Sequence, residues 1–151
     1  MKIVQSDPPP SKERSSLMRS VKTKGTSPEL CVCSILDDLR FRYQRNVAAL
    51  PGTPDIVMSK LRTVIFVHGC FWHGHDHCRK GTTRPKTRAE FWNKKIQGNV
   101  KRDRARTRKL RKLGWSVVTV WECHCSRPES VRNRITGLLN RQRAKRGTYG
   151  N

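Results

Sequence analysis

The sequence predicts an α/β protein in which a mixed β-sheet is flanked by helices and carries a loop held by a metal ion. Residues 63–67 and 115–121 are continuous runs of β-branched and aromatic residues, typical of strands buried on both faces. Segments with helical periodicity alternate with these runs, as expected for helices packed on a sheet. The third observation is the segment 68–78, which has four histidines and two cysteines in eleven positions.

The first predicted element is a helix that begins at Ser27. Ser27 is a good N-cap residue, Pro28 fits the first helical position, and Glu29 places an acid in the first turn. The apolar residues that recur on one face are Leu30, Cys33, Leu36 and Leu39. Cys33 and its neighbour Cys31 should be small core residues, because neither has a histidine beside it.

Three strands should follow this helix. Residues 41–47 alternate sufficiently for a strand, residues 50–54 form a turn rich in Pro and Gly, and a second strand starts at Asp55. Residues 63–67 should be the central strand of the sheet, and the segment rich in histidine and cysteine follows its end.

A basic helix should come next. Thr87 and Glu90 fit a capping box that opens a helical region ending before Gly114, with a break at Gly98, and core burial is the default for Phe91 and Trp92. Residues 115–121 then form a strand, and residues 128–139 form the closing helix.

The chain is strongly basic, with 33 Lys+Arg against 11 Asp+Glu and a formal net charge of +22. Such a charge indicates a nucleic-acid partner, although a ribosomal-type RNA binder or a solvated basic surface would have the same composition. Apolar periodicity is confined to the middle of the chain. We therefore expect a flexible basic arm at 1–26, one compact domain at 27–140 and a disordered basic tail at 141–151.

No apolar run is long enough to span a bilayer, and no signal-peptide pattern opens the chain. The expected location is the cytoplasm, in association with the nucleoid, with no membrane partner. In a reducing compartment, the six cysteines favour metal binding over disulfides.

The segment 68–78 is predicted to contribute to a closed tetrahedral zinc site. The candidate ligands are Cys70, His75, Cys78 and Cys123. Cys123 follows a strand that could lie beside the strand preceding the loop. His77 is the rival to His75, Cys125 is a weaker rival to Cys123, and the bland alternative is a set of buried thiols.

A second group of residues suggests phosphodiester hydrolysis. Asp55 opens a strand after a Pro-Gly-Thr-Pro turn, and with Glu29 on the preceding helix it could bind Mg²⁺, although Pro-Asp is ordinarily only turn chemistry. The acid-x-Lys tripeptide common in such nucleases is missing. Proton transfer should therefore fall to His68 and His73.

Aromatic residues form the third group. Phe71 and Trp72 lie in a polar loop, where they could act as a wedge between base pairs. Unstacking is easiest at a damaged or mismatched step, so a wedge can also detect a lesion.

Four segments closely resemble the very short patch repair DNA mismatch endonucleases. They are residues 50–55 (LPGTPD), 64–73 (VIFVHGCFWH), 87–92 (TRAEFW) and 114–123 (GWSVVTVWEC). The resemblance covers about residues 11–140. The sequence departs from the best-known member at Val67, where that protein has threonine, and in a spacing between Cys70 and Cys78 that is one residue longer.

The resemblance implies a restriction-endonuclease-like fold and an Mg²⁺-dependent hydrolase. The enzyme would nick one strand 5′ to the thymine of a T:G mismatch left by deamination of 5-methylcytosine, which initiates DNA repair. By position, two Mg²⁺ ions would bind at Asp55, His73 would be the general base oriented by Asp103, and Glu29 and His68 would assist. The structural zinc ligands would be Cys70, His75, Cys78 and Cys123. The DNA-binding residues would be the aromatic Phe71, Trp72 and Trp92, with Met18 on an N-terminal arm that grips DNA.

We therefore expect a monomeric mismatch nicking endonuclease whose partner is double-stranded DNA with a T:G mismatch. Mismatch-repair proteins and a cytosine-5 methyltransferase are its candidate functional partners. The alternative is a non-catalytic zinc-stapled nucleic-acid-binding protein, which would need neither Asp55 nor His73. A third reading is a ribosome-associated basic protein.

Overall fold

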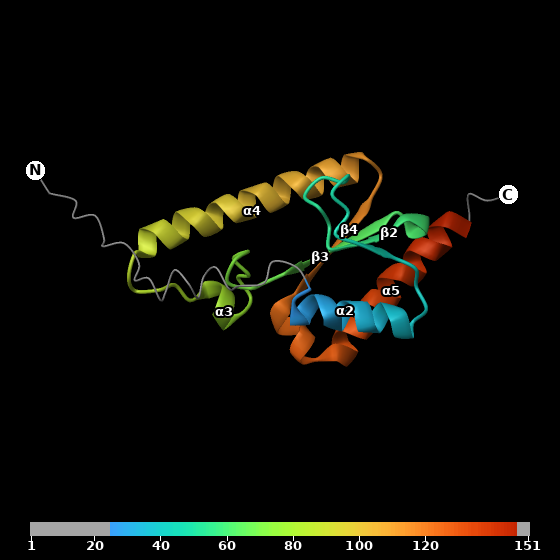
Figure 1. Cartoon of the computed structure of the whole chain (residues 1–151), viewed down its shortest axis with the longest axis horizontal. Helices are drawn as coiled ribbons and strands as arrows, with labels where there is room; N and C mark the ends of the chain where they lie inside the picture. The colour runs from blue at the N-terminus through green and yellow to red at the C-terminus, as the bar shows by residue number, and fades with distance from the viewer. Residues whose placement is uncertain (1–24, 148–151) are drawn as a thin grey trace, which may run out of the picture.

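A four-stranded mixed sheet forms the centre of the protein, whose computed structural model describes residues 25–147 (Figure 1). The strands are β1 (Gln44–Arg45), β2 (Ile56–Met58), β3 (Thr63–His68) and β4 (Ser116–Trp121), and they lie in this order across the sheet. β1, β2 and β3 pair antiparallel, whereas β3 and β4 pair parallel. The predicted mixed sheet is confirmed, with β3 as an inner strand.

Helices cover both faces of this sheet. α2 (Ser27–Asp38) and α5 (Pro128–Gly147) lie on one face, and α4 (Ala89–Lys112) lies on the other (Figure 1). Side chains of successive strand residues point to opposite faces of the sheet, so each face contributes to its own hydrophobic core. Ile56 and Ile65 pack in the cluster that includes α2 and α5, whereas Val57, Val64 and Phe66 pack with Leu110 of α4.

The N-terminus of α2 holds a buried acid. Thr26, not Ser27, is the N-cap residue: its hydroxyl oxygen accepts a hydrogen bond from the Glu29 amide at 3.4 Å, and the hydroxyl donates back to Glu29 Oε1 at 3.3 Å. The Gly25 amide donates to Glu29 Oε2 at 2.8 Å. The N-cap therefore lies one residue earlier than predicted, and these bonds, which resemble a capping box, fix the Glu29 carboxylate. Leu30, predicted to face the core, is 52% exposed.

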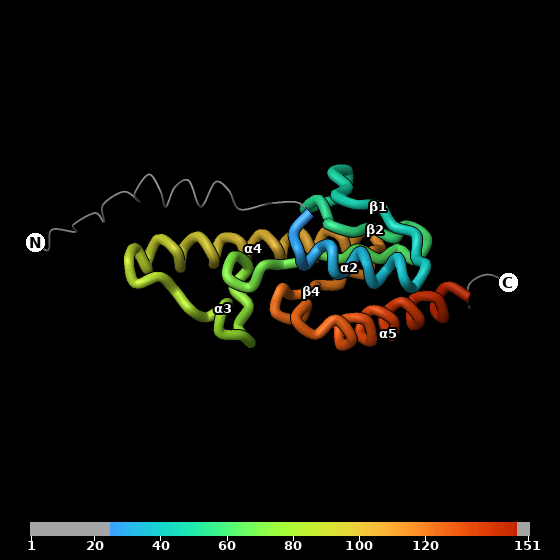
Figure 2. The backbone as a smooth tube through the Cα atoms, turned by 60° about the horizontal axis from the view of Figure 1, so that its bottom comes forward, coloured from blue at the N-terminus to red at the C-terminus, as the bar shows by residue number. Residues whose placement is uncertain are grey.

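α4 differs from its predicted form at two places. The capping box expected from Thr87 and Glu90 is wrong, because the N-cap is Arg88, which has left-handed backbone and makes no side-chain cap. Gly98 does not break the helix, which runs unbroken for 24 residues. A single helical glycine costs only about 1 kcal/mol, which burial of Ile96 and Leu110 can offset. The N-terminal part of α4 extends beyond the sheet, over the segment that carries α3 (Arg79–Thr82) (Figure 2).

Other elements differ from prediction in length. The first strand spans only Gln44–Arg45 instead of residues 41–47, and α3 was not predicted. The expected disordered tail is wrong for residues 141–147, since α5 continues to Gly147. Arg143 packs its guanidinium 4.6 Å from the centre of the Phe41 ring, and cations in a last helical turn are favourable. No helix among residues 25–147 has the length and apolar character needed to cross a membrane.

Candidate active site and metal cluster

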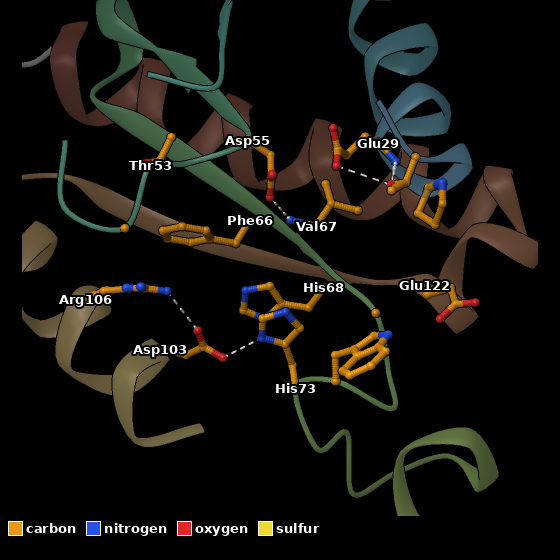
Figure 3. Close-up of a pocket in the computed structure, with 15 residues that line it drawn as sticks. Glu29, Thr53, Asp55, Phe66, Val67, His68, His73, Asp103, Arg106 and Glu122 are labelled. Atoms are coloured by element: carbon orange, nitrogen blue, oxygen red, sulfur yellow. Dashed lines mark hydrogen bonds and ion pairs between the residues drawn. The ribbon is translucent and has the colours of Figure 1, made fainter. Parts of the chain in front are cut away.

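Asp55 lies in a cleft of about 590 Å³ beside β3 (Figure 3). Its Oδ2 accepts a hydrogen bond from the Val67 amide at 2.7 Å, which ties the turn before β2 to the neighbouring strand. Burial raises the pKa of Asp55 to about 6, and the negative charge of Glu29 acts in the same direction, whereas the Val67 hydrogen bond opposes the rise. A buried carboxylate that is costly to ionise is a good place for a cation.

Glu29 lines the same cleft and is only 3% exposed. Besides its bonds within the capping box, Oε2 lies 3.6 Å from Arg45 Nη2. Mg²⁺ is usually bound by one or two carboxylates together with phosphate oxygens and water. Asp55 and Glu29 therefore supply the kind of ligands that a divalent cation would need at this end of the cleft.

Two stacked histidines form the opposite part of the cleft. The rings of His68 and His73 lie 3.8 Å apart and are nearly parallel, with 4° between their planes. His73 Nδ1 lies 2.6 Å from Asp103 Oδ2, in a hydrogen bond that joins the loop after β3 to α4. If Nδ1 carries the proton, the lone pair of Nε2 is available as a base.

The pKa values of His68 and Asp103 are both shifted downward, but for different physical reasons. Burial, with the nearby His73, lowers the pKa of His68 to about 4, so His68 is neutral at pH 7. Burial acts to raise the pKa of Asp103, but the hydrogen bond from His73 and the charge of that ring outweigh it and hold the pKa below its usual value.

His68, His73 and Asp103 are also close enough together for their ligand atoms to hold a metal. However, imidazole lone pairs lie in the ring plane, and two stacked parallel rings cannot both point at one ion. The arrangement fits a base with an orienting carboxylate better than a chelate.

Cys70, His75, Cys78 and Cys123 form a second cluster, in which all four ligand atoms lie within 4.8 Å of one another. Cys123 Sγ lies 3.4 Å from His75 Nδ1, and tetrahedral Zn–S and Zn–N bonds place neighbouring ligand atoms about 3.5 Å apart. Burial raises the pKa of the Cys70 thiol to about 12, so a thiolate there needs a cation. The donor set therefore fits a closed zinc site.

The rival ligands lie outside this cluster. The side chain of His77 is 84% exposed and lies 3.3 Å from Asp76, whereas His75 is buried and its ring stacks 4.2 Å from Trp121. Cys125 instead packs against the core and donates its thiol to the Pro28 carbonyl oxygen. The path of the loop backbone brings His75 to the cysteines, and the spacing of residues in the sequence alone could not show whether His75 or His77 does so.

Phe71, Trp72 and Trp92 form an aromatic cluster with ring centres 5.2 to 5.8 Å apart. Trp92 is only 9% exposed, and intercalation by any of the three rings stays a prediction. Phe91, for which core burial was expected, is 43% exposed. Lys95 Nζ lies 5.7 Å from the centre of the Trp72 ring, within cation–π range.

Two functional candidates were not found from the sequence. Glu122, which opens the short 3-10 helix η2 (Glu122–Ser126) after β4, accepts hydrogen bonds from the Cys70 amide at 3.4 Å and Lys80 Nζ at 3.1 Å, so it fastens the loop to the end of β4 and lines the cleft. A Cβ at Gly81 would lie 1.9 Å from the His75 carbonyl oxygen, so only glycine lets α3 approach the metal cluster. Glu122 lies in the segment 114–123 that resembles the family, but neither its role nor that of Gly81 was predicted. Of the predicted site residues, Met18 lies outside the described residues.

The family profile described as DNA mismatch endonuclease Vsr matches residues 6–80. The chain is 42% identical over 127 residues to the type II nicking enzyme V.XorIIP of Xanthomonas oryzae, an alignment that covers 84% of this chain and 92% of that protein. It is 46% identical over 110 residues to the DNA mismatch endonuclease Vsr of Escherichia coli, covering 73% and 69% of the two chains. These matches show that the chain belongs to the Vsr family of DNA mismatch endonucleases.

Proposed function

We propose that this DNA mismatch endonuclease nicks one strand of duplex DNA 5′ to the thymine of a T:G mismatch, with Mg²⁺ at Asp55. The observation that carries the proposal is the placement of Asp55 and the His73–Asp103 pair in one cleft. Two Mg²⁺ ions would stabilise negative charge on the scissile phosphate. Such an arrangement supplies both a cation site and a base for hydrolysis.

The residues of the chain divide the work of this reaction. Nε2 of His73 would accept a proton from the attacking water, and Asp103 would hold the proton on Nδ1 and stabilise the imidazolium that forms. His68, neutral at pH 7 and stacked on His73, would fix the ring plane without adding a positive charge that opposes protonation. Glu29 would assist the metal through water.

The cluster of Cys70, His75, Cys78 and Cys123 would hold one structural Zn²⁺. Its four protein ligands leave no open position, which is the arrangement of structural rather than catalytic zinc. Zinc would hold the loop that carries Phe71 and Trp72 to Cys123 at the end of β4.

The basic segment before Gly25, including Met18, would grip DNA from the side opposite the aromatic cluster. The protein would act as a monomer on the nucleoid. A cytosine-5 methyltransferase would generate the base whose deamination gives the mismatch, and mismatch-repair proteins would act on the same DNA.

The nicking assay uses one end-labelled duplex in three forms, with T:G, C:G or T:A at the same position. We expect a nick only in the T:G form, only on the thymine strand and only with Mg²⁺ present, while EDTA prevents it. A panel of sequence contexts around the mismatch would define the preferred flanks. Specific T:G binding without nicking would instead favour a non-catalytic binding protein, and preference for RNA would favour a ribosome-associated one.

Replacing Phe71 and Trp72 together by alanine tests mismatch recognition. The charge of +22 attracts any duplex and gives no selectivity, so discrimination is assigned to the aromatic pair, which enters a mismatched step at a lower unstacking cost. We expect a loss of roughly 1 to 3 kcal/mol per stacking contact in T:G binding and a much smaller loss for the matched duplex. The measurement is the ratio of the two affinities at fixed salt.

Leu113→Ala is the matched control, because Leu113 is an exposed apolar side chain at the other end of α4. It should leave the ratio of T:G to matched affinity unchanged. If the double variant lowers both affinities equally, the aromatic pair is a general stacking surface and mismatch recognition lies elsewhere.

A further inference from the structure

Arg106 is the only lysine or arginine among residues 25–147 that lines the catalytic cleft. The other charged side chains there are the carboxylates Glu29, Asp55, Asp103 and Glu122. Arg106 projects from α4 toward Asp103 and the histidine stack (Figure 3). Arg45 lies behind Glu29, with which it forms an ion pair, so Arg106 is the permanent positive side chain that a phosphodiester meets on the wall of the cleft.

The stem of Arg106 is held against the turn that leads to Asp55. A Cβ at Gly52 would lie 2.7 Å from Cδ and 3.1 Å from Cγ of Arg106, so the absence of a side chain at Gly52 leaves room for the stem. Gly52 also has φ of +79°, a conformation that L side chains rarely adopt. The packing restricts where the guanidinium can go before any ligand binds.

The guanidinium itself has donors to spare. Its contact within residues 25–147 is an ion pair in which Nη1 lies 3.8 Å from Asp103 Oδ1, too long for a hydrogen bond. Asp103 makes its short bond to His73 through the other oxygen, Oδ2. Arg106 has five N–H donors and a side chain that is 43% exposed, so it can bind a ligand without losing a hydrogen bond within the protein.

We propose that Arg106 binds the DNA phosphate that enters the cleft and holds it against the His73 base. The proposal rests on the nicking activity proposed above and adds a substrate-binding residue to it. A planar guanidinium matches two phosphate oxygens with parallel hydrogen bonds. Because it keeps its charge throughout, Arg106 transfers no proton; it orients the phosphate and stabilises the charge that develops there.

The competing explanation is that Arg106 only positions Asp103. The long, partly exposed ion pair supports this poorly, since His73 already holds Asp103 through a 2.6 Å bond. The two explanations predict different effects of an Arg106 substitution on the nicking rate once the Asp103 carboxylate has been removed. A residue acting on substrate keeps its effect, whereas a residue acting through Asp103 loses it.

The test measures single-turnover nicking of a T:G duplex with saturating enzyme and Mg²⁺. Arg106→Ala should lower the rate by roughly 10²-fold, and Arg106→Lys, which keeps the charge but loses the planar fork, by roughly tenfold. Arg104→Ala is the matched control: it removes one charge from the same helix about 200° away at an exposed position. It should change the rate by about threefold or less.

Two further measurements separate substrate binding from positioning. Arg106→Ala should lower the rate by a similar factor in an Asp103→Asn background, so that the two losses multiply. Millimolar guanidinium should restore part of the Arg106→Ala rate, compared with sodium at equal ionic strength, and should not restore His73→Ala. Thermal unfolding of every variant establishes that it is folded.

The proposal is overturned if Arg104→Ala is as slow as Arg106→Ala, or if Arg106→Ala nicks at nearly the wild-type rate. It is also overturned if Arg106→Ala has no effect in the Asp103→Asn background. In each case the wild type still nicks, so the proposed function stands. If the wild type does not nick T:G DNA, the proposed function itself is contradicted, and the role of Arg106 that depends on it falls as well.

Discussion

Asp55→Asn is expected to abolish nicking of T:G DNA while DNA binding stays equal or becomes tighter. The substitution keeps an oxygen for the Val67 amide but removes the charge that we propose binds Mg²⁺. Metal ions contribute several kcal/mol of transition-state stabilisation, so a fall of at least roughly 10³-fold is expected. Single-turnover nicking and equilibrium binding to the same duplex give the two measurements.

The same variant has an opposite effect on stability. The pKa of Asp55 is raised to about 6, so the folded protein binds this proton more tightly than the unfolded chain does, and stability falls as pH rises from about 4 to about 6. At pH 7.5 in EDTA, Asp55→Asn should unfold with a free energy roughly 1 to 3 kcal/mol higher than that of the wild type. Near pH 3 the difference should vanish.

His73→Ala provides the comparison within the active site. It should lower the nicking rate by at least roughly 10²-fold, as expected for loss of a general base, without the stability gain of Asp55→Asn and without loss of zinc. Near-normal nicking by Asp55→Asn would exclude the proposed metal site. Loss of zinc from His73→Ala would show that this histidine is a ligand.

Cys70→Ser and Cys123→Ser should each release the structural metal. Purified wild-type protein should contain about one Zn²⁺ per chain, and each variant should contain little. Losing a metal that stabilises the folded state by several kcal/mol should lower the Tm by on the order of 10 °C. Elemental analysis and thermal unfolding measure the two effects.

The chain offers matched controls for both ligand types. Cys125→Ser changes a cysteine outside the cluster and should keep the zinc, and His77→Ala should keep it whereas His75→Ala should lose it. Full zinc content in Cys70→Ser and Cys123→Ser would exclude this site.

The strands were predictable where the residues of the segment itself determine its structure. Residues 63–67 are all β-branched or aromatic, and β3 is buried on both faces as this composition predicts. The second run, residues 115–121, became a strand as predicted, but β4 is an edge strand in which only Val118 and Val120 are buried, so its expected burial on both faces is wrong. The turn before Asp55 and the start of α2 were also recognisable, because Gly, Pro and capping residues act on their own backbone. The juxtaposition of Cys70, His75, Cys78 and Cys123 was predictable from residue chemistry, together with the expectation that the strand before Cys123 lies beside the strand before Cys70.

The remaining features depend on contacts between distant segments. The position of Arg106 follows from a glycine in another loop, and the need for Gly81 follows from the approach of α3 to His75. Phe91 and Trp92 are adjacent aromatic residues, yet one is exposed and the other buried, because only Trp92 faces the rings of the 68–78 loop. Residue type alone does not contain this information.

The parallel pairing of β3 with β4 has a consequence for how the protein is made. Cys70 and Cys123 follow paired strands but are separated by 53 positions in the chain. A nascent chain that has emerged only as far as α4 offers three of the four candidate zinc ligands, and the fourth arrives when β4 is synthesised and joins the sheet. Contacts of high sequence separation form slowly, because a long loop must close first. Full coordination should therefore coincide with completion of the sheet, so that zinc retention in a truncation series ending before or after Cys123 reports whether the whole domain has folded.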